Sequence, residues 1–231
     1  MIKNKSNSIR GIVVALKANF LIVEITPQDF KELYIDQNSE KIRLLCTKRS
    51  KLDYQGFFID VGDIVFVESI DYQSKRAVIS DVEPRQTFLK RPSVANVTLI
   101  AVCISVEDPL FNSEQTSRFL ITAESANIKP VIILTKIDLI NKNVLNFYTN
   151  KLKSWGYDAY AVSIKNLQGF DLIIERFRQS KLTVLAGPSG VGKTSLINNL
   201  IPSLSLPTSS VSKKLRRGVH TTRHVELFPI G

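Results

Sequence analysis

Residues 182–200, LTVLAGPSGVGKTSLINNL, constrain the fold of this chain more than any other stretch. The apolar residues 182–186 predict a buried strand, and Leu196, Ile197 and Leu200 follow later with helical spacing. Between them, residues 187–194 fit the pattern G-x-x-x-x-G-K-[ST] at every fixed position. Glycines in such a loop let successive backbone N–H groups face one anion without a Cβ in the way. The sequence therefore predicts a phosphate-binding loop between a strand and the N-terminus of a helix.

Two side chains of this motif have predicted roles. Lys193 is expected to reach the β- and γ-phosphates of a nucleotide, and the hydroxyl of Thr194 is expected to ligate Mg²⁺. The alternative is a glycine-rich turn without a ligand, and the flanking strand and helix argue against it. The nucleotide-binding residues predicted in this stretch are Gly187, Pro188, Ser189, Gly190, Val191, Gly192, Lys193, Thr194 and Ser195.

Composition limits the class of protein. The chain has 231 residues, enough for one large domain or two small ones, and no run of 18 apolar residues predicts a transmembrane helix. Cys46 and Cys103 lie in apolar runs and are expected to be buried thiols in a reducing cytoplasm. The net charge is +10, of which residues 91–231 carry +8 from 17 basic and 9 acidic residues. Such a basic chain suggests a polyanionic partner, most often nucleic acid, although solubility alone is the plainer explanation.

The first part of the chain has the pattern of a small β domain. Five short strand-like runs lie at residues 11–16, 20–25, 41–47, 64–70 and 77–82. This pattern favours a closed barrel such as the OB-fold, a class that often binds RNA on one face. The basic residues that could line that face are Lys48, Arg49, Lys51, Lys75, Arg76 and Arg85, although each taken alone is better explained as an ordinary loop charge. Residues 1–90 are therefore predicted to form an RNA-binding OB-fold domain.

Residues 91–231 have a different periodicity, after a polar linker predicted at residues 83–92. Apolar runs at 97–106, 130–134, 159–162 and 182–186 predict buried parallel strands. Helices are expected at about 113–127 with Ser113 as the N-cap, at 144–155 ending before Gly156, and at 170–179. Alternating strands and helices predict a doubly wound α/β domain with its ligands at the carboxyl ends of the strands.

One predicted strand end has a guanine-recognition pattern. Thr135, Lys136, Ile137 and Asp138 fit [NT]-K-x-D. The carboxylate of Asp138 can accept from both N1–H and the exocyclic amine of guanine, whereas adenine has an acceptor at N1 and no amine at C2. Lys136 can lay its methylene stem along the base, and Thr135 can tie this loop to the phosphate loop. After the next strand, residues 162–166 (VSIKN) predict a second guanine contact at Ser163.

The order of these motifs is unusual. Ordinary GTPases place the phosphate loop before the guanine motifs, whereas here it follows them, which the same sheet allows if the chain is circularly permuted. Residues 211–224 then carry five basic residues and no acid where a switch segment would follow. Thr221 or Thr222 is expected to complete Mg²⁺ coordination, and His220 is a candidate for orienting the attacking water.

Taken together, these residues resemble the circularly permuted GTPases of the RsgA (YjeQ/EngC) family over essentially the whole chain. The resemblance rests on the barrel pattern, RPSVANV at 91–97, TKID, GPSGVGKTS and RGVHTT at 217–222. It implies hydrolysis of GTP to GDP with Mg²⁺, stimulation by the small ribosomal subunit, a role in late maturation of that subunit, and contact with its rRNA. We also expect a cytoplasmic monomer without membrane contact.

Two parts of the family pattern do not occur in the 231 residues. The D-x-x-G loop that follows the switch segment has no counterpart, since the match at residues 53–56 lies in the β domain, and the family's zinc-binding Cys/His cluster is absent. We therefore expect an incomplete GTPase domain in a truncated chain, with a GTP-binding and rRNA-binding module that does not hydrolyse GTP as the alternative. A guanylate kinase, whose loop resembles GPSGVGK, is a weaker alternative because that loop opens its chain.

Overall fold

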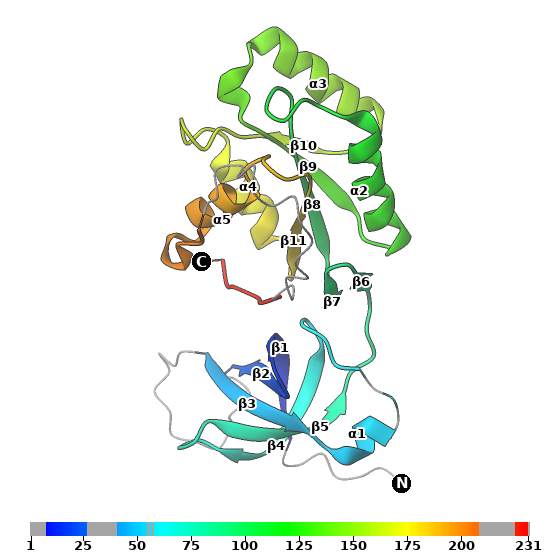
Figure 1. Cartoon of the computed structure of the whole chain (residues 1–231), viewed down its shortest axis with the longest axis vertical. Coiled ribbons are helices and arrows are strands. Elements are labelled where there is room, and N and C mark those ends of the chain that lie inside the picture. Colours follow the sequence, from blue (N-terminus) through cyan, green and yellow to red (C-terminus); the bar gives the residue numbers. More distant parts are fainter. Residues whose placement is uncertain (1–7, 27–40, 55, 57, 208–224, 231) are drawn as a thin grey trace, which may run out of the picture. The chain divides into compact units, whose positions relative to one another are not determined.

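The computed structural model describes residues 8–26, 41–54, 56, 58–207 and 225–230 (Figure 1). The chain divides into two compact units. The first comprises Met1–Asn96 with Thr222–Phe228, and the second comprises Val97–Thr221 with Pro229–Gly231. Among the described residues, every helix is too short or too polar to cross a membrane.

The first unit is a closed five-stranded barrel. Its strands run in the order β1-β2-β3-β5-β4, with β3 parallel to β5 and the other pairs antiparallel. The strands are β1 (Ile9–Lys17), β2 (Phe20–Ile25), β3 (Ile42–Lys48), β4 (Ile64–Asp71) and β5 (Arg76–Val82), and the short helix α1 (Ser50–Tyr54) follows β3. Burial alternates along β2 and β3, so one set of side chains fills the barrel and the other faces outward. The predicted OB-like barrel is confirmed.

The stretch predicted as a polar linker is folded instead. Strands β6 (Phe88–Lys90) and β7 (Ser93–Ala95) pair as a hairpin. Arg85, one of the residues that could have lined an RNA-binding face, instead donates to the buried Asp63 at 2.8 and 2.7 Å and to the backbone oxygen of Phe58 at 2.7 Å. Hydrogen bonds to Asp63 raise the pKa of Arg85. A fully buried carboxylate needs a paired cation, so this arginine stabilises the barrel and is not available to a ligand.

The second unit contains a four-stranded parallel sheet in the order β10-β9-β8-β11. The strands are β8 (Leu99–Ser105), β9 (Pro130–Thr135), β10 (Ala159–Ala161) and β11 (Thr183–Ala186). The helices are α2 (Ser113–Ser125), α3 (Lys142–Ser154), α4 (Phe170–Arg178) and α5 (Lys193–Leu200), with short 3₁₀ turns η2 (Ile137–Leu139) and η3 (Pro202–Leu204). In Figure 1, α2 and α3 lie on one side of the sheet, and α4 and α5 on the other. Every residue of β8 and β9 is buried, as the continuous apolar runs predict.

The beginning of α2 corrects one sequence-based expectation. The N-cap is Asn112 and not Ser113, because the extended backbone at Asn112 lets its side-chain oxygen accept from the N–H of Gln115 at 2.8 Å. Helix α3 ends as predicted, with Gly156 in a left-handed conformation at φ +89°.

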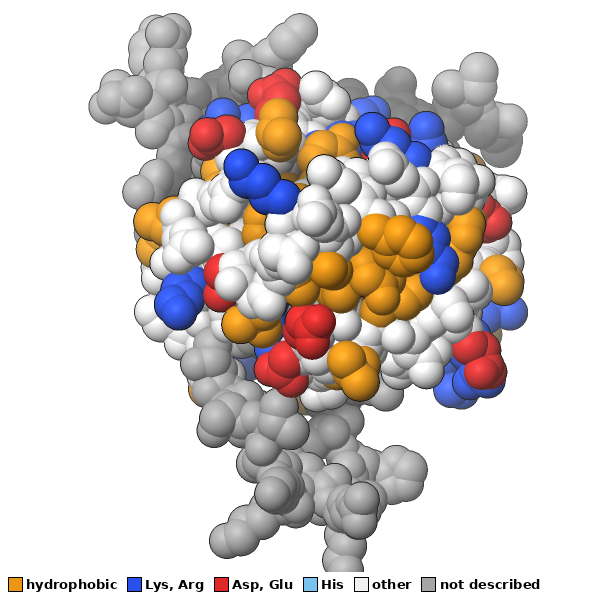
Figure 2. All heavy atoms as spheres, turned by 90° about the horizontal axis from the view of Figure 1, so that it is seen from above, with side chains coloured by type: hydrophobic (Ala, Val, Ile, Leu, Met, Phe, Trp, Pro, Cys, Tyr) orange, Lys and Arg blue, Asp and Glu red, His pale blue; other side chains and the backbone are white. Residues whose placement is uncertain are grey.

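An aromatic cluster joins α3 to the loop after β8. The ring of Phe111 lies 5.0 Å from Tyr148 and 6.3 Å from Trp155, and the ammonium of Lys151 lies 5.3 Å from the centre of the Phe111 ring. Figure 2, seen from the end where α3 lies, shows hydrophobic side chains grouped beside basic ones. These contacts hold Phe111, in the loop after β8, against α3.

Candidate functional site

The predicted ligand-binding residues lie at one edge of the parallel sheet. Thr135 is the last residue of β9, Ser163 follows β10 after one further residue, and the loop that begins at Gly187 follows β11 directly. Parallel strands present their carboxyl ends at the same edge of a sheet, where ligands of open α/β folds bind. Motifs separated by more than 50 residues in the sequence are therefore neighbours in the fold.

The first glycine of the phosphate loop touches the backbone of β8. Gly187 has φ +134°, and a Cβ placed on it would lie 2.1 Å from the carbonyl oxygen of Cys103. Gly190 and Gly192 also have positive φ, at +84° and +94°, and Gly192 is the N-cap of α5. Glycine is required at Gly187 for space and for backbone conformation, and the loop can then turn its N–H groups toward one point.

Lys193 crosses the loop that precedes it. Its ammonium donates to the carbonyl oxygens of Gly187 at 2.8 Å and Pro188 at 2.6 Å. Burial lowers the pKa of Lys193, because few water molecules remain to solvate the charge. A half-buried cation above a glycine-rich loop at a helix N-terminus fits an anionic phosphate. Thr194, in the first turn of α5, is the residue of this loop that could hold Mg²⁺.

Thr135 joins the guanine-recognition loop to the phosphate loop, as predicted. Its hydroxyl lies 2.7 Å from the carbonyl oxygen of Val191 and 2.9 Å from that of Ile104. Both oxygens are acceptors and a hydroxyl has one proton, so Thr135 donates to one of them at a time. The side chain is 2% exposed, so this contact between β9, β8 and the phosphate loop is shielded from water.

Asp138 and Ser163 were predicted as two separate guanine contacts, and the structure brings them together. The hydroxyl of Ser163 donates to Oδ1 of Asp138 at 2.6 Å, and Ser163 is fully buried. The backbone around them is also joined, because the N–H of Ile137 donates to the carbonyl oxygen of Val162 at 3.3 Å. A carboxylate held in this way is already oriented before a base arrives.

Lys136 has a partner that the sequence-based prediction did not include. Its backbone is left-handed at φ +56°, and its ammonium donates to Oδ2 of Asp108 at 2.8 Å. Asp108 could have been expected near the site, because it follows the carboxyl end of β8 and ligand-contacting residues gather at such strand ends in this class of fold.

Three predicted residues cannot be placed. His220, Thr221 and Thr222 lie outside the described residues. Within the described part of the chain, no group of three or more His, Cys, Asp or Glu side chains is arranged to hold a metal ion.

Comparison with known proteins identifies the family. Residues 82–231 match the family described as RsgA GTPase. The chain belongs to the RsgA GTPase family. RsgA-family proteins are hydrolases that act on GTP, and membership of the family implies the use of a guanine nucleotide and Mg²⁺.

The family assignment is supported along the whole chain. A protein of Prochlorococcus marinus (strain NATL1A) named small ribosomal subunit biogenesis GTPase RsgA is 74% identical over 231 residues, which cover all of this chain and 74% of that protein. The protein of the same name from Prochlorococcus marinus strain SARG is 49% identical over all of this chain and 75% of its own length.

Two solved structures share the fold. YjeQ from Thermotoga maritima has a TM-score of 0.70 at 30% identity, covering 87% of this chain and 68% of that one. YloQ, described as a circularly permuted GTPase, has a TM-score of 0.69 at 26% identity, covering 88% and 68%. The RsgA-family fold of a barrel followed by a circularly permuted P-loop unit, predicted from the order of the motifs, is therefore confirmed.

Proposed function

We propose that this RsgA-family protein hydrolyses GTP to GDP while it acts on the maturing small ribosomal subunit. In this proposal residues 1–90 form an RNA-binding OB-fold domain and residues 91–231 the GTPase domain. The observation that supports it best is the 2.6 Å hydrogen bond between Ser163 and Asp138, at the same edge of the sheet as Lys193. One edge thus offers an oriented carboxylate for a guanine and a cation for its phosphates.

Each residue has a proposed part in holding the nucleotide. Asp138 accepts from N1–H and the exocyclic amine of guanine, while Ser163 fixes its orientation and the stem of Lys136 lies along the base. Lys193 exchanges its two loop carbonyls for phosphate oxygens. Thr194 would help to hold Mg²⁺ beside the nucleotide, where the ion would supply positive charge to the phosphate oxygens. His220 is proposed to orient the attacking water, and Thr221 or Thr222 to complete the metal's coordination.

The partner follows from the relatives and from charge. Proteins that are 74% and 49% identical are named for biogenesis of the small ribosomal subunit, and the chain has a net charge of +10. We infer that the barrel contacts ribosomal RNA, because OB-fold barrels bind single strands on the face of β2 and β3. We infer that the protein acts as a monomer in the cytoplasm, since every proposed nucleotide contact comes from one chain.

The substitution Asp138→Asn tests the nucleotide site. Two hydrogen bonds to a charged group are worth about 3–4 kcal/mol together, so GTP affinity should fall by roughly 10²–10³-fold. Xanthosine triphosphate should bind the variant better than GTP, because xanthine has an acceptor where guanine has an amine. Asp158→Asn is the matched control, since Asp158 precedes β10 at the opposite edge of the sheet. Unchanged GTP affinity in Asp138→Asn would remove Asp138 from the site.

The reaction and the partner need a second experiment. Single-turnover hydrolysis of GTP is measured with and without purified small subunits, and faster turnover with subunits is expected. Binding of GTP without turnover under both conditions contradicts the hydrolysis proposal. Subunit affinity should fall as salt rises, because phosphate contacts release counterions, and a flat salt dependence contradicts the RNA contact.

A further inference from the structure

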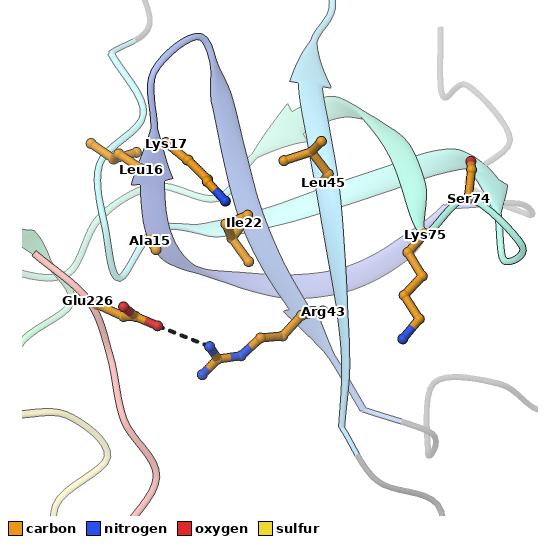
Figure 3. A pocket seen from close by; sticks show the side chains of 9 residues that line it. All are labelled: Ala15, Leu16, Lys17, Ile22, Arg43, Leu45, Ser74, Lys75 and Glu226. Carbon is orange, nitrogen blue, oxygen red and sulfur yellow. Dashed lines mark hydrogen bonds and ion pairs between the residues drawn. The ribbon is translucent and has the colours of Figure 1, made fainter. Parts of the chain in front are cut away.

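A basic hollow of about 400 Å³ opens on the barrel. Its three cations come from three elements: Lys17 from the end of β1, Arg43 from β3 and Lys75 from the turn between β4 and β5. Figure 3 shows these side chains around the apolar Leu16, Ile22 and Leu45, with the carboxylate of Glu226 beside Arg43. The hollow therefore combines cations with an apolar lining.

The segment 225–228 reaches this hollow from a distant part of the sequence. The N–H of Leu227 donates to the carbonyl oxygen of Val14 at 2.8 Å, and Glu226 forms an antiparallel bridge with Ala15. Strand β1 is open to this contact, because its pairing with β4 ends at Ile12. The segment therefore adds to the free edge of β1, as an extended peptide adds to a sheet.

Glu226 forms an ion pair with Arg43, the only arginine among the three described cations that line the hollow. Nη1 of Arg43 lies 3.0 Å from Oε1 of Glu226, and Nη2 lies 3.5 Å from the carbonyl oxygen of Leu227. Nε of Arg43 also lies 3.3 Å from Glu24, a residue of β2. Lys17 and Lys75 have no ion-pair partner among the residues that the structure describes. The carboxylate of Glu226 thus occupies a position beside the guanidinium of Arg43 that another anion could take.

The contacts that hold the segment are weak enough to be exchanged. The side chains of Arg43 and Glu226 are 40% and 30% exposed, and exposed ion pairs contribute little to stability. The backbone adds a single bridge. A guanidinium binds a phosphate with the same two-pronged geometry as a carboxylate. A polyanion that also engages Lys17 and Lys75 would therefore compete effectively with one glutamate.

We propose that this hollow binds the phosphate backbone of single-stranded RNA, and that Glu226 holds the position of one RNA phosphate on Arg43 until RNA displaces it. The inference rests on the proposed RNA contact of the barrel and names its residues and its competitor. RNA is favoured over an acidic peptide because the hollow is lined by the end of β1, by β2 and β3, and by the turn between β4 and β5. The face of β2 and β3, with the β1–β2 and β4–β5 loops, is where OB-folds bind oligonucleotides. The apolar side chains between the cations offer surface for bases, which an acidic peptide does not need.

The test uses the full chain and a fluorescein-labelled 12-nucleotide oligouridylate. Glu226→Gln should tighten binding about threefold to tenfold in a fluorescence-anisotropy titration. Glu83→Gln is the matched control, because it removes the same charge from an arginine pair on the barrel that does not line the hollow. That control should stay within twofold of the wild type. Arg43→Gln and Lys75→Gln should weaken binding, and each should lower the slope of log affinity against log salt by about one.

Each outcome decides one part of the proposal. Equal affinities for Glu226→Gln and Glu83→Gln, with loss in Lys75→Gln, would overturn the competition and leave the RNA site. Unchanged binding in both Arg43→Gln and Lys75→Gln would overturn the site itself, with thermal melts checking that the variants fold. If Glu226→Gln raises the affinity for a labelled oligoglutamate as much as it raises the affinity for oligouridylate, the preference for RNA is overturned. Absence of oligouridylate binding by the wild type would instead count against the proposed RNA contact of the barrel.

Discussion

Gly187→Ala offers a direct test of how the phosphate loop is built. A Cβ at Gly187 would lie 2.1 Å from the carbonyl oxygen of Cys103, whereas ordinary C···O contacts begin at about 3.3 Å. The end of β11 would have to move by about 1 Å, next to the register pair of Ala186 and Val102. Alanine at φ +134° adds backbone strain of about 1–3 kcal/mol.

Gly156→Ala separates the two contributions. Gly156 also has a positive φ, at +89°, but a Cβ there would meet nothing within 4 Å. That variant should lose about 1–2 kcal/mol of unfolding free energy from conformation alone. Gly187→Ala should lose about 3 kcal/mol or more, because the clash adds to the strain.

The assay has two readouts. Urea denaturation followed by circular dichroism gives the free energy of unfolding of both variants, and a fluorescent GDP analogue gives nucleotide affinity. A misplacement of about 1 Å at the loop should weaken the analogue roughly hundredfold in Gly187→Ala and leave it unchanged in Gly156→Ala. If Gly187→Ala is no less stable than Gly156→Ala and keeps its affinity, the close approach to β8 does not shape the loop.

Two further substitutions each test a hydrogen bond to a buried residue inside one of the two units. Thr135→Val keeps the shape of the side chain but leaves the carbonyl oxygen of Val191 without its donor. The free energy of unfolding should fall by about 1–3 kcal/mol, and GDP should dissociate faster in stopped-flow measurements. If neither quantity changes, the hydroxyl of Thr135 does not hold the phosphate loop. Arg85→Met leaves the carboxylate of Asp63 buried and unpaired, at a cost of about 3–5 kcal/mol by urea denaturation. Arg10→Met, in an exposed pair, should cost no more than about 1 kcal/mol, and similar losses in the two arginine variants would contradict the structural role of Arg85.

The sequence was most informative where local chemistry decides the structure. The strands and helices of the second unit follow from runs of apolar residues, and the phosphate loop follows from its glycines, of which Gly187 leaves no space for a Cβ. The chain order of the motifs then predicts the permutation, because a parallel sheet brings its strand ends together whatever their order.

What the sequence did not predict depends on contacts between distant residues. The charge of Arg85 looks like any surface charge until the fold buries Asp63 beside it. Asp108 lies 28 residues before Lys136 in the sequence, and the two side chains meet only when β8 and β9 pair. In the same way, the contact of Glu226 with Arg43 joins residues 183 positions apart.

The arrangement of the sheet also has a consequence for synthesis of the protein. Strands β8, β9 and β10 leave the ribosome before β11, which pairs with β8 through Thr183 and Leu99. The residues proposed to bind guanine follow β9 and β10. About 30 residues separate Ser163 from Lys193, so the base-binding half precedes the phosphate-binding half by a few seconds at roughly 5–20 residues per second. Ordinary GTPases emerge in the opposite sequence. In a nascent chain of this protein, the residues proposed to bind guanine are therefore assembled first, and the residues proposed to bind the phosphates follow only when β11 pairs with β8.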